Sequence, residues 1–280
     1  MQPKKLTIPD IKNRKNGTPI SVMTAYDYPW AKLVDGAGID IVLVGDSLGM
    51  VVLGYPDTVS VTMEEMIHHT KAAVRGVERA LVVADMPFGS YNSSIPAAIN
   101  NATRMLKEGR ADAVKIEGGV DMAATVAAIV RAGIPVQGHI GLTPQTATSL
   151  GGFKVQGKSA QAAKQLLEDA RALEEAGCFS MVLEAIPAPL AEHITREVGI
   201  PTIGIGAGPA CDGQVLVIHD LVGLYDRFTP KFVKQYAKIS ESVAAALAQY
   251  KTEVESRAFP TEAHSFTMKP EEMDKLLRLY

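Results

Sequence analysis

The chain of 280 residues contains only two cysteines, Cys178 and Cys211, which stand far apart. Neither belongs to a CxxC pair or to a Cys/His cluster with the spacing of metal ligands. These features argue against a disulfide framework and against a structural zinc site. They fit a protein of a reducing compartment, where thiols stay free.

Long hydrophobic runs and an excess of one charge are also lacking. No segment approaches the roughly 20 apolar residues of a membrane span, and the basic start MQPKKLTIPDIKNRKNG has no apolar signal core after it. The formal net charge is -3, with Lys and Arg scattered along the chain. We therefore expect a cytoplasmic protein that binds neither membranes nor nucleic acid, with small anions still open as partners.

What the sequence does have is a regular alternation of two kinds of segment. Helical periodicity marks residues 63–75, 97–109, 122–132, 159–177 and 189–198. Short apolar runs rich in β-branched residues mark about eight strands, at 20–25, 40–45, 80–85, 112–117, 135–140, 179–184, 200–206 and 215–220. Repeated strand and helix units indicate a parallel sheet, and eight of them favour an α/β fold of the closed (β/α)8 TIM barrel type over an open sheet.

Several helices are expected to end at a glycine in the left-handed conformation, which turns the chain toward the next strand. The candidates are Gly38, Gly109, Gly133, Gly177 and Gly199. No linker interrupts the pattern, so we predict a single barrel domain over residues 1–280. Residues from about 251 to 280 form a tail, which we expect to pack on a neighbour. Residues 141–158 are predicted to be a long loop beside the active site.

Ionisable residues stand where the predicted strands end, and a barrel directs all these positions toward one mouth. Each alone is readily explained as a helix cap or a surface ion pair, but together they indicate an active site. The six are Asp46, Asp85, Lys115, Glu117, His139 and Glu184.

Two of these carboxylates, Asp46 and Asp85, follow neighbouring strands and would suit Mg²⁺, with help from the hydroxyl of Ser47. Because the protein supplies only a few ligands, some coordination positions of the ion stay open. A 2-oxo acid would fill two of them, and the ion would stabilise the enolate that forms when the adjacent C–H loses its proton.

The remaining ionisable residues are assigned by side-chain type. Glu184 lies in apolar sequence that would desolvate the carboxylate, so it is the candidate general base. Lys115 would hold the substrate carboxylate, and His139 would hydrogen-bond its keto oxygen or acyl end. Glu117 would bind a metal-bound water.

Other motifs are weaker. The glycine-rich GIGAG at 204–208 resembles a phosphate-binding loop, but the small residues also allow a sharp turn at the barrel rim. The other histidines are expected at helix surfaces or interfaces, and they are His68, His69, His193, His219 and His264.

The order and wording of many motifs closely resemble the ketopantoate (3-methyl-2-oxobutanoate) hydroxymethyltransferase family. The resemblance covers most of the chain, through TAYDYPWAKLVDGAGID, VGDSLGMVVLGYPDTVSVTMEEMIHHT, ADMPFGSY, AVKIEGG, GHIGLTPQ, GGFKVQG, LEAIPAPLA, IGIGAGPACDGQVLVIHD and PKFVKQY. It implies a barrel of the phosphoenolpyruvate/pyruvate type. Residues 268–280 extend beyond the expected family end, and we expect their apolar face to pack on this or a neighbouring barrel.

The resemblance also implies an activity that residue spacing does not reveal. A hydroxymethyl group passes from 5,10-methylenetetrahydrofolate to 3-methyl-2-oxobutanoate, giving 2-dehydropantoate on the way to pantothenate. One Mg²⁺ per subunit is implied on Asp46 and Asp85, with Glu117 reached through water, and the oxo acid on Ser47, Asp85 and Lys115. His139 falls near the substrate and Glu184 is the base. A homo-oligomer, commonly a decamer, is also implied.

Two alternatives remain at this point. One is a Mg²⁺-dependent lyase resembling isocitrate lyase or phosphoenolpyruvate mutase, although such enzymes use a loop cysteine that neither Cys178 nor Cys211 resembles. The other is a barrel that only binds a ligand, because the fold by itself does not establish catalysis.

Overall fold

A computed structural model, which describes residues 4–149 and 151–280, shows eight parallel strands closed into a barrel. Each strand pairs with the next along the chain, and β1 pairs with β8. The strands are β1 (Ile20–Thr24), β2 (Ile41–Val44), β3 (Leu81–Asp85), β4 (Ala113–Glu117), β5 (Val136–Gly141), β6 (Ser180–Glu184), β7 (Thr202–Ile205) and β8 (Gly213–Leu216). The predicted (β/α)8 barrel is confirmed.

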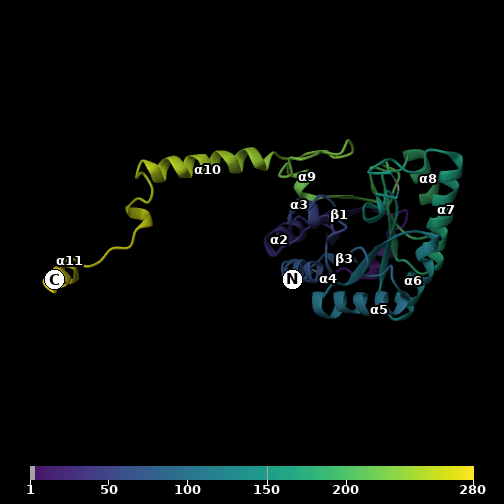
Figure 1. The fold of residues 1–280 in the computed structure, drawn as a ribbon, viewed down its shortest axis with the longest axis horizontal. Helices are drawn as coiled ribbons and strands as arrows, with labels where there is room; N and C mark the ends of the chain where they lie inside the picture. Colours follow the sequence, from purple (N-terminus) through teal and green to yellow (C-terminus); the bar gives the residue numbers. More distant parts are fainter. Residues whose placement is uncertain (1–3, 150) are drawn as a thin grey trace.

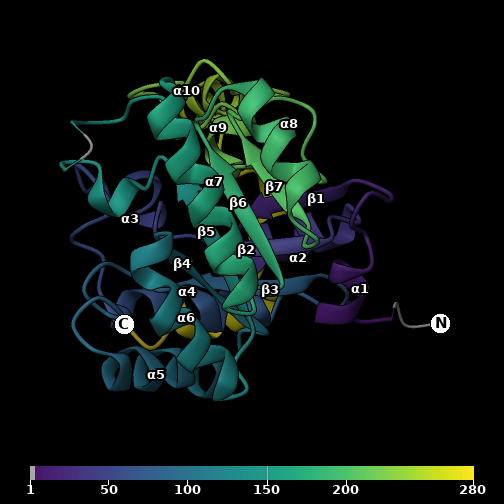
Figure 2. The same cartoon turned by 90° about the vertical axis from the view of Figure 1, so that its right-hand side faces the viewer.

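The described residues form eleven α-helices, most of which surround the barrel on its outer face (Figures 1 and 2). They are α1 (Ile8–Lys12), α2 (Tyr28–Gly36), α3 (Leu48–Val51), α4 (Met63–Val74), α5 (Ile95–Arg104), α6 (Val120–Arg131), α7 (Ala160–Glu175), α8 (Ala188–Glu197) and α9 (Ile218–Leu221), with α10 (Ile239–Glu255) and α11 (Pro270–Leu277) near the C-terminus. Side-chain caps fix several helix starts, because the hydroxyl oxygens of Thr62, Ser94 and Ser159 accept free backbone N–H groups. None of these helices is long and apolar enough to cross a membrane.

The apolar core has two parts, since side chains alternate between the two faces of each strand. One part lies between strands and helices. The other fills the barrel interior, where Val22, Leu43 and Val83 meet Ile11 of α1. Because α1 precedes β1, Ile11 covers the N-terminal end of the barrel. The opposite end is free for polar groups.

The chain departs from the predicted elements after β7. The last strand was expected at 215–220, but β8 runs from Gly213 to Leu216 and residues 218–221 form α9. The backbone N–H of Ile218 donates to the hydroxyl of Thr24 at 2.9 Å, which holds the chain as it turns out of the sheet.

Three of the five predicted glycine ends are confirmed, since Gly38, Gly133 and Gly177 have positive φ. The other two are wrong. The helix expected at 97–109 is α5 followed by a π-helical turn, Met105–Gly109, and the left-handed residue is Arg110 rather than Gly109. Gly199 is absent from the glycines with positive φ.

The C-terminal segment extends away from the barrel (Figure 1). No residue of α10 or α11 is buried, and the extension starts at α10, before the expected residue 251. Packing of α11 on its own barrel is therefore not what the structure shows. The division into one domain and a tail stays a proposal.

Candidate active site

The alternation that fills the barrel with apolar side chains also directs the charged ones inward. Leu81 and Val83 belong to the interior cluster, so Asp85 two residues later faces the same way. Lys115 and Glu117 follow Ala113 on β4 in the same manner. By this rule the C-terminal end of the barrel carries charge while the N-terminal end carries aliphatic groups. His139 of β5 and Glu184 of β6 complete the ring.

The loop after β2 brings Asp46 and Ser47 to this ring. The backbone N–H of Asp46 donates to Asp85 Oδ2 at 3.1 Å. Ser47 Oγ lies 2.9 Å from the hydroxyl of Tyr26. A Cβ at Gly45 would lie only 2.8 Å from Ser47 Oγ and 3.4 Å from Asp85 Oδ2. Glycine at this position therefore lets the two strand ends come close together.

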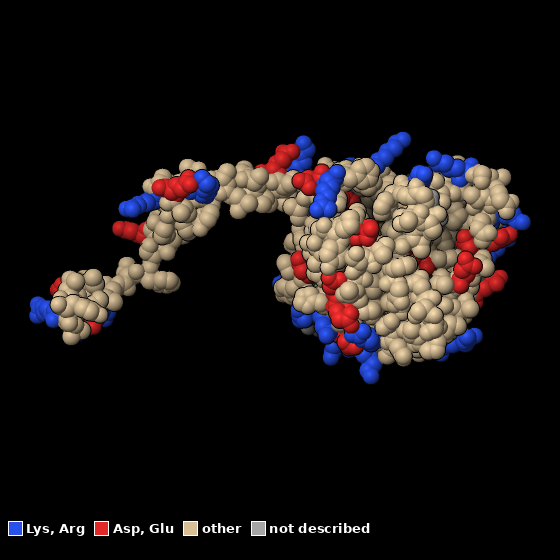
Figure 3. Space-filling model, in the orientation of Figure 1, with Lys and Arg blue, Asp and Glu red and all other residues tan. Residues whose placement is uncertain are grey.

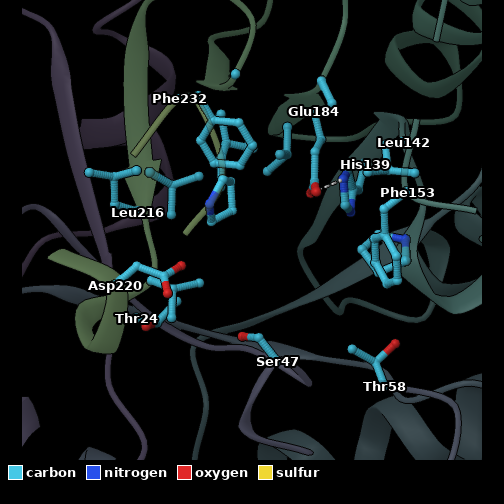
Figure 4. Close-up of a pocket in the computed structure, with 18 of the residues that line it drawn as sticks. Thr24, Ser47, Thr58, His139, Leu142, Phe153, Glu184, Leu216, Asp220 and Phe232 are labelled. Atoms are coloured by element: carbon cyan, nitrogen blue, oxygen red, sulfur yellow. Dashed lines mark ion pairs between the residues drawn. The ribbon is translucent and has the colours of Figure 1, made fainter. Parts of the chain in front are cut away.

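The charged groups form one buried network. Lys115 Nζ lies 3.2 Å from Asp85 Oδ1 and 3.1 Å from His139 Nδ1. The imidazole of His139 lies 3.4 Å from Glu117 Oε1 through Nδ1 and 3.1 Å from Glu184 Oε2 through Nε2 (Figure 4). The structure thus brings the six predicted ionisable residues together, and their individual roles stay predictions.

Burial and like charge dominate the electrostatics of this network. Burial, followed by the charges of Asp85 and Glu117, raises the pKa of Asp46 well above its usual range. Burial and Lys115 lower the pKa of His139, but its pairs with Glu117 and Glu184 outweigh them and raise it to about 9. Lys115 and the protonated His139 face Asp46, Asp85, Glu117 and Glu184, so carboxylates still outnumber cations and a further cation would relieve their repulsion.

The donor set fits a hard divalent cation. Asp85 Oδ1 and Glu117 Oε1 are buried and accept no hydrogen bond. Within the described residues, no three His, Cys, Asp or Glu side chains are placed to hold a metal ion together. A site built on Asp46 and Asp85 would therefore need oxygens from water and substrate to complete its coordination, as Mg²⁺ commonly does.

Two residues that the sequence reasoning missed hold Asp46 and Glu117 in place. Gln145, in the loop after β5, donates through Nε2 to Asp46 Oδ2 at 2.8 Å and to the carbonyl of Met86 at 2.9 Å. Its backbone N–H donates to Glu117 Oε2 at 3.1 Å. The hydroxyl of Tyr91 donates to Gln145 Oε1 at 2.6 Å. Both residues lie in quoted motifs, GHIGLTPQ and ADMPFGSY, but no spacing rule singles them out.

The network lies on one side of a cavity of about 720 Å³. The predicted loop 141–158 does border it, through Phe153, Lys154 and Val155 among its described residues. Neither cysteine lines the cavity, and both thiols are buried, which counts against a lyase that uses a loop cysteine. The glycine-rich segment also lines the cavity, through Gly206 and Gly208. A Cβ on Gly206 would lie only 2.7 Å from the ring of Phe232, so glycine lets this ring pack against the backbone.

One of the remaining histidines lies at a buried interface between elements and not at a helix surface. His219 is buried, and its ring packs 5.5 Å from the ring of Tyr26 and 6.1 Å from that of Trp30. Tertiary packing explains the difference, since α9 folds back over the β1 end of the barrel. His69 is half-buried, with Nδ1 2.7 Å from the carbonyl of Tyr26. His68, His193 and His264 are exposed, as expected.

Comparison with known proteins places this barrel in a family. A family model described as ketopantoate hydroxymethyltransferase matches residues 5–262. The chain belongs to this family. Among similar family members, the 3-methyl-2-oxobutanoate hydroxymethyltransferase of Heliobacterium modesticaldum is 64% identical and the match covers 96% of this chain and 98% of that one. The enzyme of the same name from Moorella thermoacetica is 60% identical, over 95% of this chain and 99% of its own.

Solved structures with low sequence identity to this chain share its fold. A phosphonopyruvate hydrolase in complex with oxalate and Mg²⁺ has a TM-score of 0.60 at 12% identity, covering 98% of both chains. A phosphoenolpyruvate phosphomutase from Streptomyces platensis has a TM-score of 0.61 at 16% identity, with the same coverage.

The sequence relatives also bear on the C-terminal segment. Two related 3-methyl-2-oxobutanoate hydroxymethyltransferases align over 97% of this chain. That coverage reaches into residues 268–280, so this segment departs less from the family than expected.

Proposed function

We propose that this ketopantoate hydroxymethyltransferase family member transfers a hydroxymethyl group from 5,10-methylenetetrahydrofolate to 3-methyl-2-oxobutanoate, giving 2-dehydropantoate for pantothenate biosynthesis. The observation that carries the proposal is the convergence of Asp46, Asp85 and Glu184 on one cavity. A carboxylate pair for a metal ion and a separate carboxylate base are what removal of a proton beside a keto group requires. The names of the relatives supply the substrate.

Glu184 is the proposed base because it is the network's most accessible carboxylate. Its side chain is 16% exposed, against 2% for Glu117 and 4% for Asp85, and Figure 4 shows it at the cavity surface. Its environment differs from the expected apolar one, since His139 faces it at 3.1 Å. The imidazole orients the carboxylate toward C3 of the oxo acid, where Glu184 removes the proton.

The substrate would be held by Ser47 and Lys115, with Asp85 between them. The ammonium of Lys115 is buried between Asp85 and His139, so a bound carboxylate would meet a fixed positive charge. We propose one Mg²⁺ per subunit on Asp46 and Asp85, with Glu117 reached through water. When bound, the ion stabilises negative charge on the keto oxygen.

The overall reaction balances with one water. A C–C bond forms between C3 and the one-carbon unit, and the bonds from that unit to the two folate nitrogens break. Water supplies the hydroxyl oxygen of the product. The C3 proton and the second hydrogen of water end on the two nitrogens of tetrahydrofolate, so no oxidant or reductant is needed.

We also propose that the chain works as a homo-oligomer, a homodecamer by the resemblance, in the cytoplasm. Support for assembly comes from α10. Its apolar side chains recur every three or four residues, at Val243, Leu247, Tyr250 and Val254, and all are exposed. An apolar helix stripe of this kind is typical of a surface that packs on another helix.

The direct test is turnover of the two substrates with Mg²⁺, comparing wild type with Asp46→Ala and Glu184→Gln. We expect hydroxymethyl product from wild type and a loss of about 10²–10⁴-fold in both variants. Glu168→Gln, an exposed carboxylate on α7, is the matched control and should keep full activity. Release of glyoxylate or pyruvate from a larger acid would instead support a lyase.

A further inference from the structure

The cavity is larger than the proposed oxo acid needs. Its volume of about 720 Å³ lies within the range of roughly 300–1,000 Å³ that holds drug-sized ligands, whereas 3-methyl-2-oxobutanoate has only five carbons. The charged network occupies one side, at Glu184 and His139 in Figure 4. The other side, around Thr24, Leu216 and Asp220, is free for a second molecule.

Asp220 is the polar group of this second side. It lies on α9, directly after β8, and is only 9% exposed. Its carboxylate points into the cavity in Figure 4 and makes no hydrogen bond or ion pair with any residue in the described ranges. Burial raises its pKa to about 6. A carboxylate with no protein partner at the wall of a cavity is free to accept hydrogen bonds from a bound ligand.

Asp220 is also close to the reacting side. Burial raises the pKa of the Tyr26 hydroxyl, and the negative charges of Asp220 and Asp85 add to the increase. That hydroxyl is hydrogen-bonded to Ser47, a proposed substrate contact. A ligand on Asp220 would therefore lie next to the oxo acid.

Aromatic side chains also line the cavity. Phe232 packs over Gly206 and Phe228 is 68% exposed, while Phe153, which is 56% exposed, lies on the His139 side in Figure 4. Exposed rings gathered around one cavity favour a flat, largely apolar ligand. Beyond them, Lys154 and Lys231 also line the cavity, and neither forms an ion pair within residues 4–149 and 151–280.

We propose that the cavity binds the folate cosubstrate beside the oxo acid, with the pteridine on Asp220, the aminobenzoyl group among the aromatic rings and the glutamyl carboxylates near Lys154 and Lys231. The inference rests on the proposed function, which makes a tetrahydrofolate the carbon donor. The pyrimidine edge of the pteridine presents N3–H and a 2-amino group side by side. Two carboxylate oxygens accept both donors at once, in the geometry that makes such pairs strong.

Each chemical group of the cosubstrate has a matching kind of side chain in the cavity lining. The pteridine end carries N5, to which the one-carbon unit is attached, and it would lie deepest, beside Tyr26 and Ser47. The anionic end would lie at the lysines on the rim. The reverse orientation would place glutamyl carboxylates against the carboxylate of Asp220, which like charge disfavours.

The test compares Asp220→Asn with Asp226→Asn, an exposed carboxylate six residues along the same segment. The probes are tetrahydrofolate and 6-methyltetrahydropterin, which lacks the aminobenzoyl and glutamyl groups, and calorimetry measures their Kd. We expect Asp220→Asn to weaken both probes by about ten- to hundred-fold, as loss of a charged hydrogen-bond pair does, while Asp226→Asn binds as wild type does. A double Lys154→Gln, Lys231→Gln variant should weaken tetrahydrofolate alone.

Exchange of the C3 proton of 3-methyl-2-oxobutanoate in D₂O, without folate, separates this inference from the proposed function. Wild-type exchange together with unchanged tetrahydrofolate binding in Asp220→Asn would overturn the inference and leave the function standing. Loss of exchange in Asp220→Asn would also overturn it, since Asp220 would then support the whole site. If wild type neither exchanged the proton nor transferred the hydroxymethyl group, the proposed function itself would fail.

Discussion

Gln145 shows how one residue positions two carboxylates of the site, Asp46 and Glu117. Its amide binds Asp46 Oδ2 and its backbone N–H binds Glu117 Oε2, so it sets the spacing of the two acids. Residues that orient metal ligands commonly contribute 10–100-fold to metal affinity. We expect Gln145→Leu to weaken Mg²⁺ binding by about this factor, measured by calorimetric titration. Tyr91→Phe, which leaves the amide in place, should have a smaller effect.

Comparing the Mg²⁺ affinities of Gln145→Leu and Tyr91→Phe requires that both variants fold. Circular dichroism would show whether both variants fold as wild type does. A folded Gln145→Leu protein that bound Mg²⁺ with unchanged affinity would contradict the positioning role.

Asp220 gives a prediction for stability against pH. Its pKa lies at about 6 in the folded chain, above the ordinary 3.8. Because the folded state holds this proton more tightly, the stabilising contribution is full below about pH 3.8 and is lost as pH rises through 6. Asp220→Asn should therefore unfold like wild type near pH 4 and be more stable at pH 8, by at most about 3 kcal/mol. Denaturant unfolding at both pH values measures this, and a pH-independent difference would count against it.

The inward-facing charged residues were predictable because strand ends and alternation place them. Asp85, Lys115 and Glu117 each follow an apolar run at a position whose direction the barrel sets. Gln145 and Tyr91 were not predictable in this way, since their contacts join loops 54 residues apart. Polar loop residues resemble ordinary turn residues until the fold brings them together.

At the scale of elements, α10 extends away from its own barrel (Figure 1) and has no buried residue. Its exposed stripe includes Leu247, while Ala245 lies on the opposite side of the helix. We expect Leu247→Glu to dissociate the proposed homo-oligomer, because a charge within an apolar contact is strongly unfavourable. Ala245→Glu adds the same charge off the stripe and should leave assembly intact. Analytical ultracentrifugation would compare the two, and equal masses would contradict this role of α10.

The last helix carries a second prediction about assembly. The apolar residues Met273, Leu276, Leu277 and Tyr280 of the C-terminal segment are exposed. If they pack on a neighbouring barrel, deletion of residues 268–280 should lower the melting temperature and shift the mass distribution toward smaller species. Scanning calorimetry and light scattering measure these effects. Unchanged values for both would contradict packing of this segment on a neighbouring barrel.

Element boundaries were less predictable than element order. The run 215–220 is apolar enough for a strand, but the chain turns after Leu216 because Thr24 binds the backbone at Ile218. The end of α5 likewise depends on a π-helical turn that places Arg110, not glycine, in the left-handed region. In both places a contact distant in sequence or a local backbone adjustment overrides the pattern.

At the scale of the whole molecule, the barrel separates stability from chemistry. Its N-terminal half holds aliphatic side chains covered by α1, and its C-terminal half holds the charged network and the cavity. On the face seen in Figure 3, acidic and basic side chains are interspersed. Inside the barrel mouth, the like charges of three buried carboxylates are useful only if a cation and a substrate join them.

The measurement that tests this account most directly is exchange of the C3 proton of 3-methyl-2-oxobutanoate with D₂O, followed by NMR with Mg²⁺ and without folate. The account predicts rapid exchange by wild type, a loss of about 10²–10⁴-fold in Glu184→Gln, and a return to the no-metal rate when the metal is chelated. Exchange by Glu184→Gln at the wild-type rate would contradict the assignment of Glu184 as the base.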